Sequence, residues 1–208
     1  MWEKVNPMEV AHIDAFRRDP DRFWHFYSQR FMSLRDKQPN RAHEIVAELE
    51  RRGFVRAVVT QNIDRLHRAA GSRDVIEVHG SISHSVCLQC GGRFELEKVV
   101  EQIEAHPDSA PECTRCFQPL KPDVVLFGEF LPEDALRRAN DLAAEADLML
   151  AIGSSLEVHP VAALPEATLE NGGKLVLITQ GPTPYDRDAA VKLEGDVVDE
   201  LSGVFAAL

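Results

Sequence analysis

Four cysteines are the residues of this sequence whose types and spacing point most directly to a chemistry. They form two Cys-x-x-Cys pairs, Cys87 with Cys90 and Cys113 with Cys116, separated by residues 91–112. Two such pairs offer four thiolates to one tetrahedral zinc ion, and the metal then stabilises a segment too small for its own core. Four sulfur ligands leave no open coordination position. The pattern predicts a structural zinc site, with a redox pair as the alternative.

Polar side chains follow two short apolar runs, where an open α/β sheet would bind a ligand. They are Gln61, Asn62 and Asp64 after the run 55–59, and His79 after the run 75–78. Ligands of such sheets bind outside the carboxyl ends of the strands, and an imidazole there has the pKa range of a general base. Alternatively, Asn62 or Asp64 caps a helix that starts at Arg65, and His79 is a hydrogen-bonded structural residue.

Two further turns are weaker signals of a site. Gly153, Ser154 and Ser155 follow an apolar run and offer backbone N–H groups and hydroxyls to phosphate oxygens. Phe127-Gly128-Glu129 is another turn at the end of a run. Both kinds of turn are common, so neither one alone specifies a ligand.

The elements that must position these residues are alternating helices and strands. Apolar residues at helical spacing predict helices over 7–18 and 21–34, and a third is opened by Pro39 and Asn40 and ended by Gly53. Buried parallel strands are expected at 55–59, 75–78, 124–127, 148–152 and 175–178, and helices at 132–145, 159–170 and 197–207. This alternation predicts an α/β fold with a parallel sheet flanked by helices.

All four cysteines fall in residues 83–122, which interrupt the alternation. We interpret this segment as a small zinc module inserted into a sheet domain formed by residues 1–82 and 123–208. The first glycine is Gly53. No glycine-rich turn for a pyrophosphate therefore lies upstream of it, although a nucleotide-binding α/β domain normally begins with one.

Composition limits the possible classes of function. The 208 residues are 44% hydrophobic and 27% charged, which is enough apolar side chain to build a core. A formal net charge of -11 without a basic block argues against direct nucleic-acid binding. No apolar run reaches the roughly 20 residues that cross a bilayer, and Met1 to Lys4 show no basic-then-apolar pattern. We expect a cytoplasmic protein with no membrane partner and no direct nucleic-acid partner.

Together, these motifs resemble those of the sirtuins, the NAD-dependent protein deacylases. The matching pieces occur in the family's order from about Trp2 to Leu201. They are Pro39-Asn40-Arg41-Ala42-His43, residues 60–67, Ala70-Gly71-Ser72, Val78-His79-Gly80-Ser81, the four cysteines, Phe127-Gly128-Glu129, residues 153–158 and Pro160. Several independent motifs in the right order argue against a chance match.

The resemblance implies a Rossmann-like domain and a small zinc module, with NAD and an acyl-lysine protein or peptide meeting in a cleft between them. By that resemblance Gln61, Asn62 and Asp64 hold the nicotinamide and its ribose, and His79 is the base. By the same resemblance, Gly153, Ser154 and Ser155 contact the phosphates and the adenine ribose. Thr179, Gln180 and Glu194 are further cofactor contacts, where the family usually has Asn at the position of Thr179.

Substrate binding is implied in the same way. The segments containing Phe127 and Glu129, and Glu157 and Val158, would pair with the substrate backbone as added strands. Residues 7–36 would lie near the cofactor and the acyl pocket. Tyr27 and Arg30 look like the Tyr-x-x-Arg pair of the subgroup that prefers acidic acyl groups such as succinyl or malonyl, because a phenol and a guanidinium bind a distal carboxylate. The alternative places Tyr27 in the core and Arg30 in solvent.

The implied chemistry removes an acyl group from a lysine. The acyl oxygen displaces nicotinamide from the ribose, and His79 deprotonates a ribose hydroxyl that attacks the resulting imidate. The products are free lysine, nicotinamide and O-acyl-ADP-ribose. A catalytically impaired peptide-binding module and a mono-ADP-ribosyltransferase are the alternatives.

One piece of the family's pattern has no counterpart in these residues. The family's first strand, its Gly-Ala-Gly turn and the cofactor loop are missing, and Met1-Trp2 resembles the residues just after that loop. Such a strand normally lies in the middle of the sheet, so its loss would leave neighbouring strands unpaired. We expect that the true start lies upstream, since the other motifs are intact.

Overall fold

The computed structural model describes residues 11–208, and the chain divides into two compact units. Within the described residues, unit 1 contains 11–37, Gln61–Arg65 and His79–Leu131, and unit 2 contains Gln38–Thr60, Leu66–Val78 and Pro132–Leu208. Each unit has a hydrophobic core of its own. Among residues 11–208, every helix is too short or too polar to span a bilayer.

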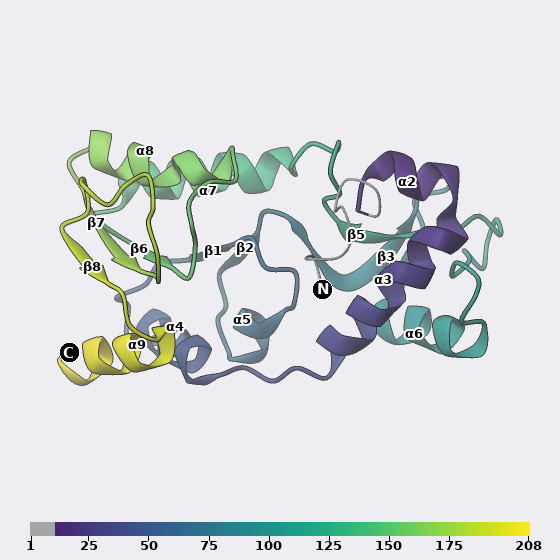
Figure 1. Ribbon diagram of the computed structural model, residues 1–208, viewed down its shortest axis with the longest axis horizontal. Coiled ribbons are helices and arrows are strands. Elements are labelled where there is room, and N and C mark those ends of the chain that lie inside the picture. The colour runs from purple at the N-terminus through teal and green to yellow at the C-terminus, as the bar shows by residue number, and fades with distance from the viewer. Residues whose placement is uncertain (1–10) are drawn as a thin grey trace. The chain divides into compact units, whose positions relative to one another are not determined.

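Among its described residues, unit 1 starts with two consecutive helices (Figure 1). Helix α2 is Ile13–Arg18 and helix α3 is Pro20–Arg35. Asp19 caps α3, because its side chain accepts the backbone N–H of Arg22 at 3.0 Å. The helix predicted over 21–34 is confirmed. Of the helix predicted over 7–18, residues 13–18 are helical, and residues 7–10 lie outside the described part of the chain.

The buried face of α3 is aromatic and forms much of the core of unit 1. Phe23, Trp24, Tyr27 and Phe31 recur at helical spacing and contact one another edge to face, stacked or tilted. The indole Nε1 of Trp24 donates to the carbonyl oxygen of Leu120 at 2.7 Å, which ties α3 to the sheet. Helix α6, Leu96–Ala105, buries its apolar side in the same core.

The sheet of unit 1 is antiparallel. Its order is β4-β3-β5, with β3 at Gly80–Cys87, β4 at Arg93–Glu95 and β5 at Leu120–Val124. The parallel strand expected at 124–127 is therefore wrong, because the strand ends at Val124 and runs antiparallel to β3. A short apolar run carries no information about the direction of its partner. Phe127, which that run included, is 50% exposed.

Unit 2 contains two parallel sheets. One pairs β1, Val58–Thr60, with β2, Val75–Glu77; the other has the order β6-β7-β8, with strands Leu148–Ile152, Lys174–Ile178 and Val191–Leu193. The parallel strands expected near 55–59, 75–78, 148–152 and 175–178 are confirmed, and β8 was not predicted. Between residues 11 and 208 no strand pairing joins the two sheets.

Helices flank these strands. They are α4 at Arg41–Arg51, α5 at Leu66–Ala69, α7 at Glu133–Glu145, a 3-10 turn at Val161–Ala163 followed by α8 at Leu164–Glu170, and α9 at Val197–Ala206. Asn40 and His43 form a reciprocal capping box at the start of α4. Ile45 of α4, Leu201 of α9 and Ile178 of β7 share one buried cluster. The predicted α/β fold class is confirmed.

Candidate functional site

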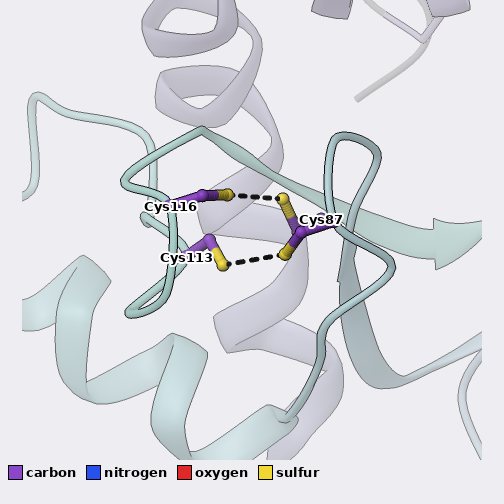
Figure 2. A group of neighbouring side chains, drawn as sticks. Cys87, Cys113 and Cys116 are labelled. Carbon is purple, nitrogen blue, oxygen red and sulfur yellow. Dashed lines mark hydrogen bonds between the residues drawn. The ribbon is translucent and has the colours of Figure 1, made fainter.

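The four cysteine sulfurs converge within unit 1 (Figure 2). The Sγ atoms of Cys87 and Cys116 are 3.4 Å apart, those of Cys90 and Cys113 are 3.5 Å apart, and all four lie within 4.8 Å of one another. Four thiolates bound to zinc at about 2.3 Å form a tetrahedron with edges of about 3.8 Å. The donor set and its spacing therefore fit one Zn²⁺, as the sequence predicted.

Local hydrogen bonds favour the thiolate form of the buried members of this cluster. Burial acts to raise the pKa of Cys113, but the backbone N–H groups of Arg115 and Cys116 donate to its sulfur and lower that pKa to about 6. The pKa of Cys87 is lowered in the same way, against burial, by the backbone N–H groups of Cys90 and Gln89. Because zinc binds thiolates, these turns prepare Cys87 and Cys113 for the metal. For Cys116 the backbone N–H of Gln118 acts to lower the pKa, but burial and the neighbouring cysteines outweigh it and raise that pKa to about 12.

The side chain of His79 points to the loop that carries the predicted polar trio. His79 is half-buried directly before β3, and its Nδ1 lies 3.2 Å from the backbone carbonyl oxygen of Gln61. The backbone carbonyl of His79 in turn accepts the N–H of Val125 at 2.8 Å. One hydrogen bond therefore holds the ring of His79 and another holds its backbone carbonyl, next to the start of the Gln61 loop.

This contact also assigns the tautomer of His79. A carbonyl oxygen only accepts hydrogen bonds, so Nδ1 must carry the proton in the bond to Gln61. The neutral ring then has its lone pair on Nε2. The arrangement leaves Nε2 as the nitrogen that can take a proton from a substrate hydroxyl.

The rest of the loop is anchored to β3. The backbone N–H of Ile82 donates to the carbonyl of Ile63 at 3.0 Å, which fixes the middle of the segment Gln61–Arg65. Asn62 is exposed and Asp64 is half-buried. Arg65 has φ of 68°, a conformation that a non-glycine residue rarely adopts and that often marks a functional turn.

Gly80, the residue after His79, has a conformation that only glycine adopts easily. Its φ is 74°, and a Cβ atom there would collide with the carbonyl oxygen of Asp123. The absence of a side chain lets β3 and β5 approach closely at this point. The backbone of His79 is fixed by the same approach.

The second group of predicted residues lies at the carboxyl edge of the β6-β7-β8 sheet in unit 2. Register pairs Ile152 with Ile178 and Ile178 with Leu193. The residues directly after these three are Gly153, Thr179 and Glu194. The N–H of Gly153 donates to the carbonyl of Ile178 at 2.9 Å, and the N–H of Thr179 to that of Leu193 at 3.0 Å. Three predicted cofactor contacts therefore lie side by side.

This edge is open where a phosphate would approach the backbone. Gly153 has φ of 60°, and a side chain placed on it would meet no atom within 4 Å. Beside it, Ser155 is exposed, and the Oγ of Ser154 accepts the N–H of Leu156 at 3.2 Å. Open backbone and hydroxyls at the carboxyl end of parallel strands suit an anionic dinucleotide.

The side chains of Gln180 and Glu194 at this edge contact protein groups. Gln180 is exposed, and its Nε2 donates to the carbonyl of Gly195 at 3.5 Å. The carboxylate of Glu194 lies 3.0 Å from the ammonium of Lys192.

The predicted substrate contacts lie in both units. In unit 1, Phe127 forms an isolated parallel bridge with His12, and Phe127 is half exposed. The carboxylate of Glu129 accepts the N–H of Leu126 at 2.9 Å. In unit 2, Glu157 and Val158 are both exposed between β6 and α8.

Tyr27 lies in the aromatic core of unit 1. It is 5% exposed and stacks on Phe23, with ring centroids 4.8 Å apart. Burial raises the pKa of Tyr27, and the nearby charge of Arg30 partly opposes that rise. Arg30 is half-buried one helical turn further along α3. The two residues therefore share a face of the helix, and the guanidinium acts on the phenol.

Sequence reasoning gave no role to Lys121. It lies in β5 and is the only charged residue among those described that is fully buried. Its Nζ is 2.8 Å from the carboxylate of Glu129. In the sequence Lys121 lies in the segment Leu120-Lys121-Pro122-Asp123-Val124, beside a second charged residue, so no local signal marked it as buried.

Comparison with protein families gives one match that covers most of the chain. The model of the Sir2 family matches residues 1–160. A protein of Thermotoga maritima named NAD-dependent protein deacetylase is 43% identical over 196 residues, which are 94% of this chain and 79% of that protein. A protein of Pyrobaculum aerophilum named NAD-dependent protein deacylase 2 is 41% identical over 195 residues, covering 94% of this chain and 76% of that protein.

Solved structures agree with this result. A structure of Sir2Tm bound to a propionylated peptide superposes with a TM-score of 0.91 at 40% identity, covering 98% of this chain and 85% of that one. A structure of Sir2 bound to an acetylated peptide superposes with a TM-score of 0.91 at 41% identity, covering 95% of this chain and 82% of that one. With the four-cysteine cluster and the His79 loop in place, these matches establish that the chain belongs to the Sir2 family.

Proposed function

We propose that this chain is an NAD-dependent protein-lysine deacylase that releases nicotinamide and an O-acyl-ADP-ribose. The observation that carries the proposal is the hydrogen bond from His79 Nδ1 to Gln61, which leaves Nε2 as a base beside the polar loop. Family membership supports it, because relatives are named deacetylases and deacylases and the solved relatives bind acetylated and propionylated peptides.

His79 is the proposed catalytic base. NAD supplies the reactive ribose and nicotinamide as the leaving group. Nε2 of His79 takes the proton of a ribose hydroxyl, while the bond to Gln61 keeps the ring in the basic tautomer. Gln61, Asn62 and Asp64 bind the nicotinamide and its ribose and so fix the hydroxyl with respect to the base.

The remainder of the cofactor binds to the strand ends of unit 2 in this proposal. The residues are Gly153, Ser154, Ser155, Thr179, Gln180 and Glu194. Support comes from their adjacent register positions and from the open space at Gly153. In this proposal the hydroxyl of the exposed Ser155 contacts a phosphate oxygen, and Glu194 contacts the cofactor through its backbone.

The acyl-lysine peptide is proposed to bind as an added strand. The segments concerned contain Phe127 and Glu129 in unit 1 and Glu157 and Val158 in unit 2. Phe127, Glu157 and Val158 are exposed, and backbone groups of such segments can pair with an extended peptide. Specificity then resides in the pocket for the acyl group.

We further propose a preference for acidic acyl groups such as succinyl. Arg30 is half-buried and its charge acts on the phenol of Tyr27, which places a guanidinium near a hydroxyl. Such a pair favours a distal carboxylate over a methyl group. Deep burial of Tyr27 makes Arg30 the dominant partner in this proposal.

Zinc has a structural role in this proposal. All four sulfurs are ligands, so no coordination position is left for a substrate. We propose that residues 83–122 form a zinc module and that residues 1–82 and 123–208 form the cofactor-binding domain. Reduced cysteines of this kind are typical of a cytoplasmic protein, which is where we place it.

Mass spectrometry of an acyl-lysine peptide incubated with the chain and NAD tests the function. Deacylation removes the acyl mass in a reaction that requires NAD. A peptide or protein that gains the mass of an ADP-ribosyl group would indicate a transferase instead. An unchanged peptide that nevertheless binds would indicate a binding module.

A further inference from the structure

A buried ion pair lies outside the residues to which the mechanism gives a role. The side chain of Lys121 is 6% exposed, that of Glu129 is 25% exposed, and Nζ and Oε2 are 2.8 Å apart. Burying an ammonium group is costly unless it is both paired and hydrogen-bonded. The pair therefore requires a structural or functional reason.

All hydrogen-bonding capacity of Lys121 is used within the protein. Its Nζ donates to the carbonyl oxygens of Pro122 at 3.2 Å and Val124 at 2.7 Å, besides contacting Glu129. An ammonium has three donors and here it has three acceptors. Lys121 is thus not a ligand-binding residue, and its contacts all hold the segment that comes after it in the chain.

Glu129 closes a turn at the other end of that segment. The Oε2 atom that contacts Lys121 also accepts the N–H of Leu126 at 2.9 Å, and the N–H of Glu129 donates to the carbonyl of Leu126 at 3.0 Å. Gly128 within the turn has φ of 85°. Phe130, the next residue outside the turn, is 98% exposed. The ion pair therefore fixes the base of a turn whose outer side is apolar and open.

The same segment bonds to the backbone of the proposed base. Val124 pairs with Gly80, and the N–H of Val125 donates to the carbonyl of His79 at 2.8 Å. Phe127 adds a second attachment, because its N–H donates to Ala11 and its carbonyl accepts from Ile13, each at 3.0 Å. Residues 124–129 thus connect His79 with the turn that presents the proposed peptide-binding backbone.

We infer that Lys121 and Glu129 are positioning residues that hold residues 124–129 in the conformation required to bind the acyl-lysine peptide. This inference rests on the proposed function. The expected backbone pairing of this segment with the substrate stays a prediction, and the carboxylate of Glu129, which contacts Lys121 and the N–H of Leu126, is assigned to holding the turn. The ion pair then holds the apolar turn, and the backbone hydrogen bond to His79, in one conformation before any ligand binds.

Hydrogen–deuterium exchange of the full chain tests the inference independently of catalysis. In K121M the amides of residues 124–131 should exchange faster than in the wild type, while those of α6 should not change. K98M is the matched control, because Lys98 forms an exposed ion pair with Glu101 at the same distance of 2.8 Å. Unchanged exchange over 124–131 in K121M overturns the inference.

Steady-state kinetics tests the consequence for substrate binding. The double variant K121M/E129M removes both charges, so it avoids the unpaired, half-buried carboxylate that K121M would leave. Its KM for the acyl peptide should rise roughly ten- to hundredfold, with the KM for NAD and the zinc content unchanged. If the ion pair only stabilises the fold, the folded double variant should have the wild-type KM for the peptide. That result would overturn the inference.

The two proposals fail in distinguishable ways. A wild-type chain without turnover contradicts the proposed function, and the exchange measurement still decides whether Lys121 holds the turn. A wild-type chain that turns over, combined with an unchanged peptide KM in K121M/E129M, contradicts the inference alone.

Discussion

At the scale of single residues, the proposed mechanism depends on the nitrogen of His79 that faces away from Gln61. The 3.2 Å contact of Nδ1 with a carbonyl places the proton on Nδ1 and the lone pair on Nε2. One hydrogen bond orients the ring, and a second fixes the backbone of His79. The residue can therefore act as a base without rearrangement.

Replacing His79 by Ala should abolish most of the turnover and leave the fold intact. Loss of a general base lowers kcat by roughly 100- to 10,000-fold, and the half-buried site tolerates a small side chain. Steady-state kinetics and zinc content check this expectation. H84A is the control, since His84 lies on β3 and pairs with Glu95 on the protein surface. Equal kcat values for H79A and the wild type would remove His79 from the mechanism.

Arg30 should decide between acyl groups. R30M removes the guanidinium and keeps an unbranched apolar stem, so kcat/KM for a succinyl-lysine peptide should fall by about tenfold or more. The value for an acetyl-lysine peptide should remain within about twofold, because a methyl group makes no ion pair. Competition between the two peptides in one reaction measures the ratio. An unchanged ratio would refute the acidic-acyl preference.

At the scale of elements, the zinc cluster joins the end of β3 to the segment before β5. Cys87 is the last residue of β3, and Cys113 and Cys116 precede β5. Cys87 and Cys113 are buried in the core of unit 1, so the metal and the core are coupled. Metal binding to such a site contributes directly to folding.

Removal of zinc should therefore unfold part of unit 1. A strong chelator should lower the Tm and release one zinc per chain, and added zinc should restore both. Differential scanning calorimetry with metal analysis checks the change. Even with added zinc, C87S should have the lowered Tm of the chelated wild-type protein. A chain that keeps its Tm after complete zinc loss would contradict the structural role.

The segment before β8 contains a carboxylate, that of Asp186, which should affect the free energy of unfolding. Asp186 contacts Lys192 at 2.9 Å and accepts hydrogen bonds from the backbone and hydroxyl of Thr183. The ion pair with Lys192 and these bonds lower the pKa of Asp186 below its ordinary value of 3.8. The carboxylate thus contributes stability above 3.8, and the contribution is lost as the pH falls through the lowered folded-state pKa.

The variant D186N measures that contribution. Urea unfolding at neutral pH should show a lower free energy of unfolding for D186N than for the wild type. The difference should shrink as the pH drops below 3.8, because the wild-type carboxylate then becomes protonated. A difference that stays constant down to about pH 2 would contradict the assigned cause.

The elements also show how much of the fold the sequence could predict. Helices over 21–34 and after Asn40, and strands near 148–152 and 175–178, were predictable because apolar spacing and caps are local signals. The strand expected at 124–127 failed because pairing direction depends on a distant partner, here β3. For the site, the four cysteines and His79 were identifiable by chemistry and spacing. Lys121 was not, since its burial and its contact with Glu129 arise only in the folded chain.

At the scale of the whole molecule, the chain combines two compact units that each carry part of the proposed machinery. Unit 1 holds the zinc cluster, His79 and the Gln61 loop, and unit 2 holds the strand edge at Gly153, Thr179 and Glu194. The chain spans 79% of the Thermotoga maritima relative and 76% of the Pyrobaculum aerophilum relative. Activity of these 208 residues therefore has to be measured on this chain itself.

The most direct test counts both products of one reaction. The 208-residue chain is incubated with NAD and an acyl-lysine peptide, and nicotinamide and free-lysine peptide are quantified by chromatography and mass spectrometry. The proposed mechanism predicts equal molar amounts of the two, each formed only when NAD and peptide are both present. Nicotinamide release without acyl loss, or acyl loss without NAD, would contradict it.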